Sequence, residues 1–146
     1  MPVVCANYDF SKTPLRRHIK PYVILKKGGR KIGIIGLLTD LSVVVDVSVA
    51  AQLKYSHPAE TAERYAGILK RKGCDLIICL THLGYEGELY TDQELAASTR
   101  NVDIIVGGHS HTRIDRPGVV KDLDGDDVLI VTDGKWGIEI GKLTVR

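Results

Sequence analysis

The chain has 146 residues, of which 44% are hydrophobic and 26% are charged, and this composition is typical of one soluble domain covering residues 1–146. Twenty basic against eighteen acidic residues give a net charge of +2, which is too balanced for a nucleic-acid-binding surface. No uninterrupted apolar stretch of about 18 residues is present, so we expect no membrane span. The first residues also lack the long apolar core of a secretory signal.

Three cysteines, Cys5, Cys74 and Cys79, cannot all pair with one another. Two of them lie inside apolar, strand-like runs. We therefore expect buried free thiols rather than a disulfide framework.

Two apolar runs, residues 22–25 and 32–38, flank a Gly-Gly turn and predict a β-hairpin. The basic residues at 26–31 could form a phosphate-binding patch, but a solvated hairpin tip is the better interpretation. Ser56, His57 and Pro58 then open a helix that Gly73 ends. We assign His57 to this helix start rather than to a metal site.

Residues 74–80 and 102–106 form two predicted buried strands, separated by a helix at 88–99. Near-continuous apolar strands that alternate with helices predict a parallel sheet covered on both faces. Turn signals then punctuate short strands around 119, at 128–131 and at 138–145, which we expect to add antiparallel strands. The expected fold class is α/β, with a parallel or mixed sheet, covering helices and added antiparallel strands.

Histidines follow both buried strands directly. His82 comes two residues after the first strand, and the second runs into Gly107, Gly108, His109, Ser110 and His111. Ligands of open α/β sheets bind beyond the carboxyl ends of the strands, and neighbouring strands lie about 4.8 Å apart. Imidazole nitrogen binds Zn²⁺, Mn²⁺, Fe or Co, so the pattern predicts a metal site. We expect the two glycines to let the backbone turn sharply and approach a bound group.

Other polar residues have weaker patterns. Asn7 and Asp40 follow predicted strands and could support the metal site, although loop capping and turn formation are the alternatives. The acidic residues at 122–127 lack the spacing of an EF-hand and predict a polar hairpin turn. Residues 85–88 could line the site or form a solvated loop.

Several segments together resemble the 5'-nucleotidase branch of the calcineurin-like metallophosphoesterases. They are ANYDF at 6–10, KPY at 20–22, KIGIIGL at 31–37, GCDLIICLTHLG at 73–84 and NVDIIVGGHSHT at 101–112, followed by Trp136, Gly137 and Gly141. The GGHSH segment is the most specific of them.

The resemblance implies a partial metallophosphoesterase fold and a metal-dependent phosphoric-ester hydrolase acting on nucleotides. His82 and His109 would bind the second of two divalent ions (Zn, Mn, Fe or Co), and His111 would meet the first. Such a pair of ions activates water and neutralises charge on the phosphoryl group. Relatives in this family are often periplasmic or attached to the cell surface.

The family's Asp-x-His, Gly-Asp-x-x-Asp and Gly-Asn-His-Asp/Glu segments would precede Ala6 and do not occur in these 146 residues. We therefore expect the chain to be the second half of a catalytic domain, with weak metal binding and incomplete activity by itself. It should need its amino-terminal half or self-associate. The alternative is a non-catalytic binding or scaffold module that retains half of a metal site. A dinucleotide-binding fold is disfavoured because no G-x-G-x-x-G follows a predicted strand.

Overall fold

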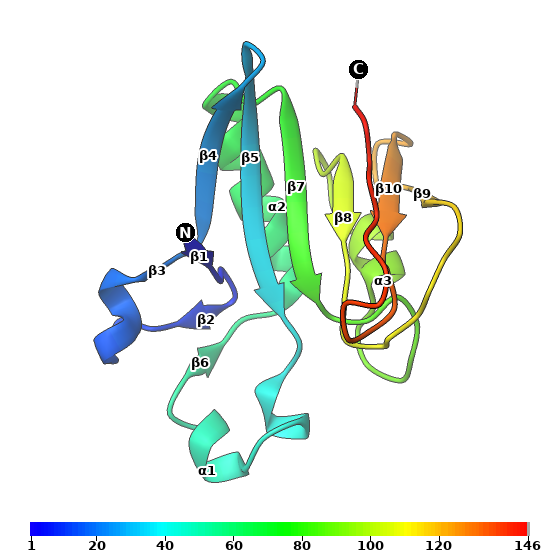
Figure 1. Cartoon of the computed structure of the whole chain (residues 1–146). Coiled ribbons are helices and arrows are strands. Elements are labelled where there is room, and N and C mark those ends of the chain that lie inside the picture. Colours follow the sequence, from blue (N-terminus) through cyan, green and yellow to red (C-terminus); the bar gives the residue numbers. More distant parts are fainter. Residues whose placement is uncertain (146) are drawn as a thin grey trace.

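A six-stranded mixed sheet forms the centre of the computed structural model, which describes residues 1–145 (Figure 1). The strand order is β4-β5-β7-β8-β10-β9. The strands are β4 (Tyr22–Lys27), β5 (Arg30–Leu38), β7 (Leu76–His82), β8 (Ile104–Val106), β9 (Gly118–Lys121) and β10 (Asp127–Val131). The four inner strands β5, β7, β8 and β10 run parallel, whereas β4 and β9 pair antiparallel at the two edges.

Smaller elements surround one end of this sheet. Two short strand pairs form there, β1 with β3 in parallel and β2 with β6 antiparallel. These strands span Val3–Val4 (β1), Tyr8–Asp9 (β2), Ile19–Lys20 (β3) and Lys54–Tyr55 (β6), with the short helix α1 at Val47–Ala50 and 3₁₀ turns at Pro14–Arg17 and Leu41–Val43. Among residues 1–145, no helix has the length and apolar character needed to cross a bilayer.

The predicted hairpin is confirmed as β4 and β5. Gly28 and Gly29 at its tip have φ values of +58° and +76°. Positive φ at both central residues is what a tight two-residue hairpin turn requires, and glycine adopts it at little cost. The predicted acidic hairpin turn also forms, between β9 and β10, where Asp122 accepts hydrogen bonds from the backbone N–H groups of Asp124 and Asp126.

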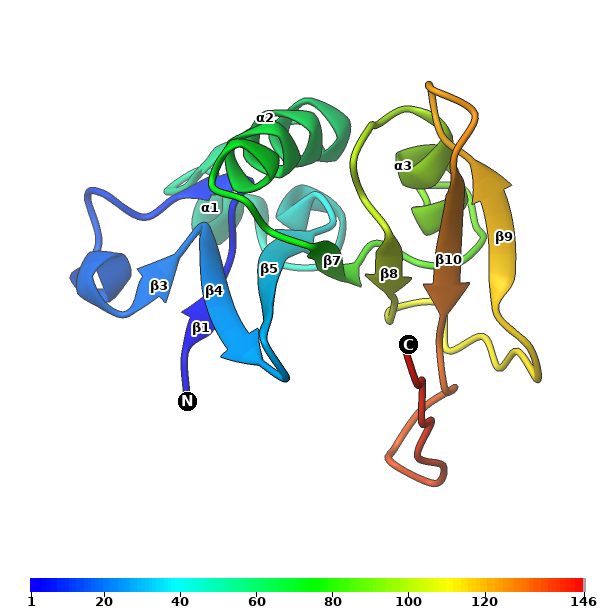
Figure 2. The same ribbon diagram turned by 90° about the horizontal axis from the view of Figure 1, so that it is seen from above.

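Two helices, α2 (Pro58–Arg71) and α3 (Asp92–Ala97), cover one face of the sheet (Figure 2). The Nδ1 atom of His57 accepts a hydrogen bond from the Ala59 N–H, so this histidine is the predicted helix cap. Ala62, Ala66 and Leu69 of α2 are fully buried against the sheet. The three cysteines are buried and free, as predicted.

Four predicted elements differ from the structure. The helix expected at 88–99 is only α3, because Thr91 and Glu94 form a reciprocal capping box that starts it at Asp92. The two buried strands begin two residues later than expected, at Leu76 and Ile104. The strand expected at 138–145 is wrong, since that described segment contains no strand.

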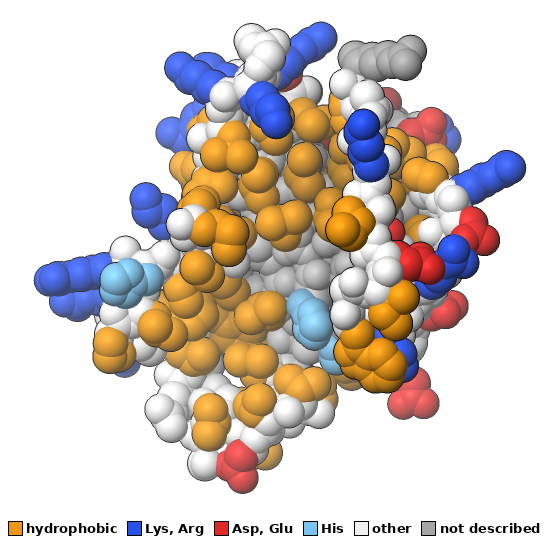
Figure 3. Space-filling view, in the orientation of Figure 1, with side chains coloured by type: hydrophobic (Ala, Val, Ile, Leu, Met, Phe, Trp, Pro, Cys, Tyr) orange, Lys and Arg blue, Asp and Glu red, His pale blue; other side chains and the backbone are white. Residues whose placement is uncertain are grey.

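The expectation of a sheet covered on both faces is also wrong. The helices cover only one face, and the segment after β10 crosses part of the other (Figure 2). On that other face Leu25, Leu80 and Val106 remain 46%, 41% and 39% exposed. Apolar side chains consequently spread across the front of the sheet (Figure 3). We call this surface the open face.

Candidate metal site

The ends of two parallel strands bring His82 and His109 together. β7 ends at His82, and β8 ends three residues before His109, with Leu80 paired to Val106 in the parallel ladder. The two imidazole rings have centroids 4.9 Å apart and planes at 71° to each other. The sequence prediction that these two side chains meet is therefore matched by the geometry of the strand ends.

The loop after β8 has an unusual backbone. His109 and His111 have φ values of +78° and +58°, in the left-handed region that few residues other than glycine adopt. Histidine is among the side chains that tolerate this region best, and such conformations gather at functional sites. The Ser110 N–H donates to the Gly108 carbonyl at 3.1 Å, which tightens the turn.

Ser110 also joins this loop to the loop after β7. Its Oγ accepts a hydrogen bond from the Tyr85 N–H at 3.0 Å and lies 2.9 Å from the Thr112 hydroxyl. The Gly107 N–H donates to the Val131 carbonyl at 2.8 Å, so the base of the loop is held by the neighbouring strand β10. These bonds fix the loop that carries His109 and His111 relative to the loop that follows His82.

Gly107 and Gly108 provide room rather than the sharp turn that we expected from them. The left-handed residues of the loop are His109 and His111, and neither glycine has a positive φ. A Cβ on Gly108 would lie 3.3 Å from Nδ1 of His82, and one on Gly107 would overlap the carboxyl group of Asp92. Their contribution is close packing around the histidine loops.

The pKa of His82 is lowered, first by desolvation and then by repulsion from His109 and His111. Lowering favours the neutral imidazole, which is the form that binds metals. The His111 side chain is exposed and does not form a three-residue ligand group with the pair among residues 1–145.

Asn7 and Asp40 both form hydrogen bonds to the backbone. The buried Asn7 amide donates to the Leu38 carbonyl at 2.7 Å and accepts from the Leu38 N–H at 3.0 Å, so it completes the end of β5. The Asp40 carboxylate accepts a hydrogen bond from the Ser42 N–H and caps a 3₁₀ turn. Asp40 therefore forms the turn cap given as its alternative, whereas Asn7 makes neither a cap nor a turn and instead ties its segment to Leu38. A supporting role for either residue at the metal site stays a prediction. Asn7 still acts near the site, because Leu38 pairs with His82 across the sheet.

The sequence analysis missed Asp92, which lies beneath the two loops. It is fully buried, and its Oδ1 accepts a hydrogen bond from the Thr81 hydroxyl at 2.6 Å. The signal was present in the Thr91-x-x-Glu94 pattern, which would have started the helix at this carboxylate instead of at Glu88.

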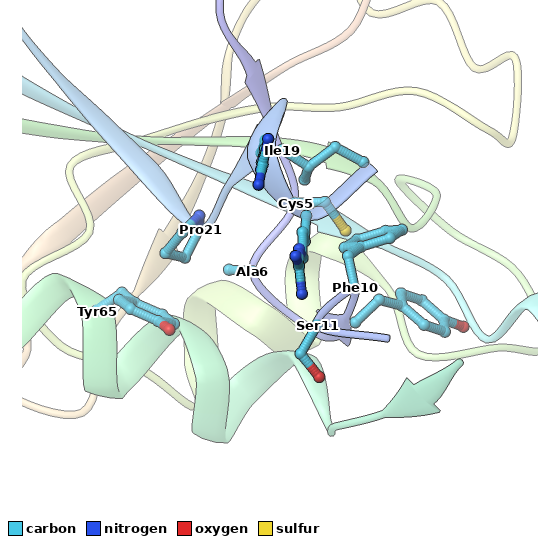
Figure 4. A pocket seen from close by; sticks show the side chains of 10 residues that line it. Cys5, Ala6, Phe10, Ser11, Ile19, Pro21 and Tyr65 are labelled. Carbon is cyan, nitrogen blue, oxygen red and sulfur yellow. The ribbon is translucent and has the colours of Figure 1, made fainter. Parts of the chain in front are cut away.

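Of two cavities in this part of the molecule, only one touches a candidate ligand. One of 290 Å³ lies beside the histidines and is lined by Leu83, residues 86–89, His109 and Ser110. Of the predicted segment 85–88, residues 86–88 line this cavity, while Glu86 and Glu88 stay exposed to solvent. A second cavity, of 540 Å³, lies among the first twenty-one residues and Tyr65, with Cys5, Phe10 and Pro21 in its wall (Figure 4). None of the candidate metal ligands lines that second cavity.

The separation of the two histidine rings shows whether both imidazoles could bind the same ion. Two imidazoles that bind one ion at about 2.0–2.1 Å, with an angle of about 90–110° at the ion, have ring centroids about 4.5–5.2 Å apart. The observed 4.9 Å falls within this range. Within residues 1–145, however, no group of three or more His, Cys, Asp or Glu side chains is close enough to hold a metal. The pair fits part of a coordination sphere, and these residues do not complete it.

Comparison with known proteins places the chain in a family. The profile described as "Calcineurin-like phosphoesterase" matches residues 2–113. The chain belongs to the calcineurin-like phosphoesterase family. Its fold is accordingly the mixed α/β fold that the sequence resemblance implied, and phosphoesterases of this family are binuclear metal enzymes.

Similar calcineurin-like phosphoesterases include nucleotidases of known structure. A 5'-nucleotidase precursor from Thermus thermophilus superposes with a TM-score of 0.83 at 36% identity, over 94% of this chain and 29% of that one. An NAD nucleotidase from Haemophilus influenzae superposes with a TM-score of 0.74 at 30% identity, over 90% of this chain and 28% of that one. An apyrase from Anopheles gambiae is 30% identical over all of this chain and 28% of its own length. The chain thus spans under a third of these relatives.

Proposed function

We propose that this chain is part of the catalytic domain of a metal-dependent phosphoesterase that hydrolyses nucleotides. In this proposal His82 and His109 bind one divalent cation and His111 approaches a second. The carrying observation is the 4.9 Å separation of the His82 and His109 rings at the ends of adjacent parallel strands. The names of the similar proteins, 5'-nucleotidase, NAD nucleotidase and apyrase, support a nucleotide-type substrate.

Bound divalent cations would supply positive charge to phosphate oxygens and lower the pKa of a coordinated water. The chain's own residues would hold such a cation in place. The lowered pKa of His82 favours the neutral imidazole, and the loop carrying His109 is fixed by the Ser110–Tyr85 hydrogen bond. The remaining ligands would come from water or from protein outside these residues, because residues 1–145 hold no complete set. Zn²⁺, Mn²⁺, Fe and Co are all compatible with imidazole ligands.

Phosphate release from AMP by the full-length protein, with Mn²⁺ or Co²⁺ present, tests this function. We expect the His109→Ala variant to lose about 100-fold or more of the wild-type rate, since one cation would lose a direct ligand. His18→Ala is the matched control, because His18 is exposed and lies in the segment that joins the first 3₁₀ turn to β3. Absence of phosphate release from the wild type, or full activity of His109→Ala, would contradict the proposal.

The incomplete ligand set favours a second candidate, a non-catalytic module that binds a nucleotide or a partner protein. Calorimetric titration of the 146-residue chain with Zn²⁺ and, separately, with AMP distinguishes the two. Tight AMP binding without hydrolysis, in both the chain and the full-length protein, would favour the module. Binding of AMP only when metal is present would favour the phosphoesterase.

A further inference from the structure

A buried carboxyl group lies directly behind the end of β7, which carries His82, and the loop after β8, which carries His109. The Asp92 side chain has no exposed surface and extends from the first turn of α3. Its Oδ1 accepts the Thr81 hydroxyl, whereas its Oδ2 has no hydrogen-bond partner among residues 1–145. Buried polar atoms are nearly always paired, so this unpartnered oxygen needs an explanation.

The carboxyl group lies against the end of β7 and the loop after β8 at once. Thr81 immediately precedes His82, and side chains alternate along a strand, so Thr81 faces the helices while His82 faces the open face. On the loop after β8, Gly107 lies two residues before His109, and a Cβ there would overlap Asp92 Oδ2 and come within 3.7 Å of Thr81 Oγ. Gly107 has no positive φ, so its backbone does not require glycine, whereas the space beside Asp92 does.

Asp92 is itself held firmly. The capping box of Thr91 and Glu94 fixes the start of α3. The Asp92 backbone N–H donates to the Gly84 carbonyl at 2.7 Å, which ties the helix start to the loop after β7. The carboxyl group is therefore a rigid spacer between the end of β7 and the loop after β8.

We propose that Asp92 is a positioning residue that sets the spacing of His82 and His109 through Thr81 and Gly107. The inference rests on the proposed metal site, which it deepens by naming a group that acts on the ligands without touching the ion. Burial, partly offset by the Thr81 hydrogen bond, raises the pKa of Asp92 to about 6. Groups that orient metal ligands typically change metal affinity about 10–100-fold when removed.

The test is a Co²⁺ titration of the 146-residue chain followed by visible absorption, together with nuclear Overhauser contacts between the His82 and His109 rings. We expect Asp92→Ala to weaken Co²⁺ binding about tenfold or more and to weaken the ring contacts. Asp92→Asn keeps the shape and the acceptor for Thr81, so it should retain most of both signals. Leu95→Ala is the control for simple loss of stability, since Leu95 is buried in the same helix.

A second pair of variants keeps the inference testable if Asp92→Ala folds poorly. Gly107→Ala should weaken Co²⁺ binding because its methyl group displaces the carboxyl group. In the double variant Gly107→Ala with Asp92→Ala, the methyl group has space. The fold loss of Co²⁺ affinity in this double variant should therefore be at least about threefold smaller than the product of the fold losses in the two single variants. Strictly multiplicative losses would overturn the inference.

Two further results would overturn it: wild-type affinity and ring contacts in Asp92→Ala, or equal losses in Leu95→Ala. If the wild type binds no Co²⁺, the proposed metal site fails. The ring contacts then decide the positioning role alone: retained contacts in Asp92→Ala overturn it, and lost contacts support it.

Discussion

At the scale of single residues, the site depends on atoms that pack behind the histidines as much as on the histidines themselves. Gly108 allows the His109 loop to approach the His82 ring, and Gly107 allows it to approach Asp92. His109 and His111 hold left-handed backbone conformations, which cost about 1–3 kcal/mol each for residues other than glycine. The folded chain maintains this strain through the hydrogen bonds of Ser110 and Gly107.

The buried carboxyl group of Asp92 should make stability depend on pH. Its folded pKa of about 6 lies above its usual value of 3.8, so the folded state favours the protonated form. The resulting stabilisation is complete below about pH 4 and is lost as the pH rises through about 6. Two pKa units correspond to about 3 kcal/mol. Urea unfolding at about pH 4 and about pH 7.5, on the wild type and on Asp92→Asn, measures this contribution.

The amide introduced by Asp92→Asn would mimic the protonated acid and remove that dependence. We therefore compare the free energy of unfolding of Asp92→Asn with that of the wild type at each pH. This difference should favour the variant by about 2–3 kcal/mol more at the higher pH than at the lower one. All other titrating groups are common to the two proteins and cancel in the comparison. An identical difference between the two proteins at both pH values would show that the Asp92 pKa is not raised.

At the scale of elements, the arrangement of strand ends could be predicted and the detail around them could not. Unbroken apolar runs indicated parallel neighbours, which is why the meeting of His82 and His109 followed from the sequence. The contact of Asp92 with Gly107 joins α3 to the loop after β8, and no local pattern encodes such a contact. The length of α3 was misjudged because Glu88 and Leu89 suit a helix, whereas the capping box at Thr91 decides where it begins.

The start of α3 is itself testable. The Thr91 Oγ accepts a hydrogen bond from the Glu94 N–H at 3.2 Å, and the Thr91 N–H donates to Glu94 Oε2 at 2.8 Å. Thr91→Ala should lower the free energy of unfolding by about 1 kcal/mol, because the helix loses its cap. Thr91→Ser keeps the hydroxyl and should stay within a few tenths of a kcal/mol of the wild type. Equal losses in both variants, measured by denaturant unfolding, would assign the effect to packing instead.

At the scale of the whole molecule, the open face separates this chain from an ordinary parallel sheet. Such strands are normally buried on both sides, and here one side presents Leu25, Leu80 and Val106 to solvent (Figure 3). The chain also spans only 28–29% of the relatives described above. The sequence predicted apolar strands but could not show which layer covers them, since a covering layer need not come from the same residues.

We expect the 146-residue chain to self-associate through this face at micromolar concentration, because large apolar patches seldom stay exposed. Replacing Leu25 and Leu80 together by lysine should shift the protein toward monomer in sedimentation velocity. Leu123→Lys is the control, since Leu123 is 50% exposed but lies in the β9–β10 turn. A wild-type chain that sediments as a clean monomer would refute this expectation.

The central claim is that the imidazoles of His82 and His109 share one cation. Anomalous diffraction from crystals grown with Zn²⁺ or Mn²⁺, recorded at the absorption edge of the metal, tests it directly. The account predicts a peak about 2.0–2.2 Å from one nitrogen of each ring. A metal peak at other residues, or one bound to a single ring while the other points away, would contradict it.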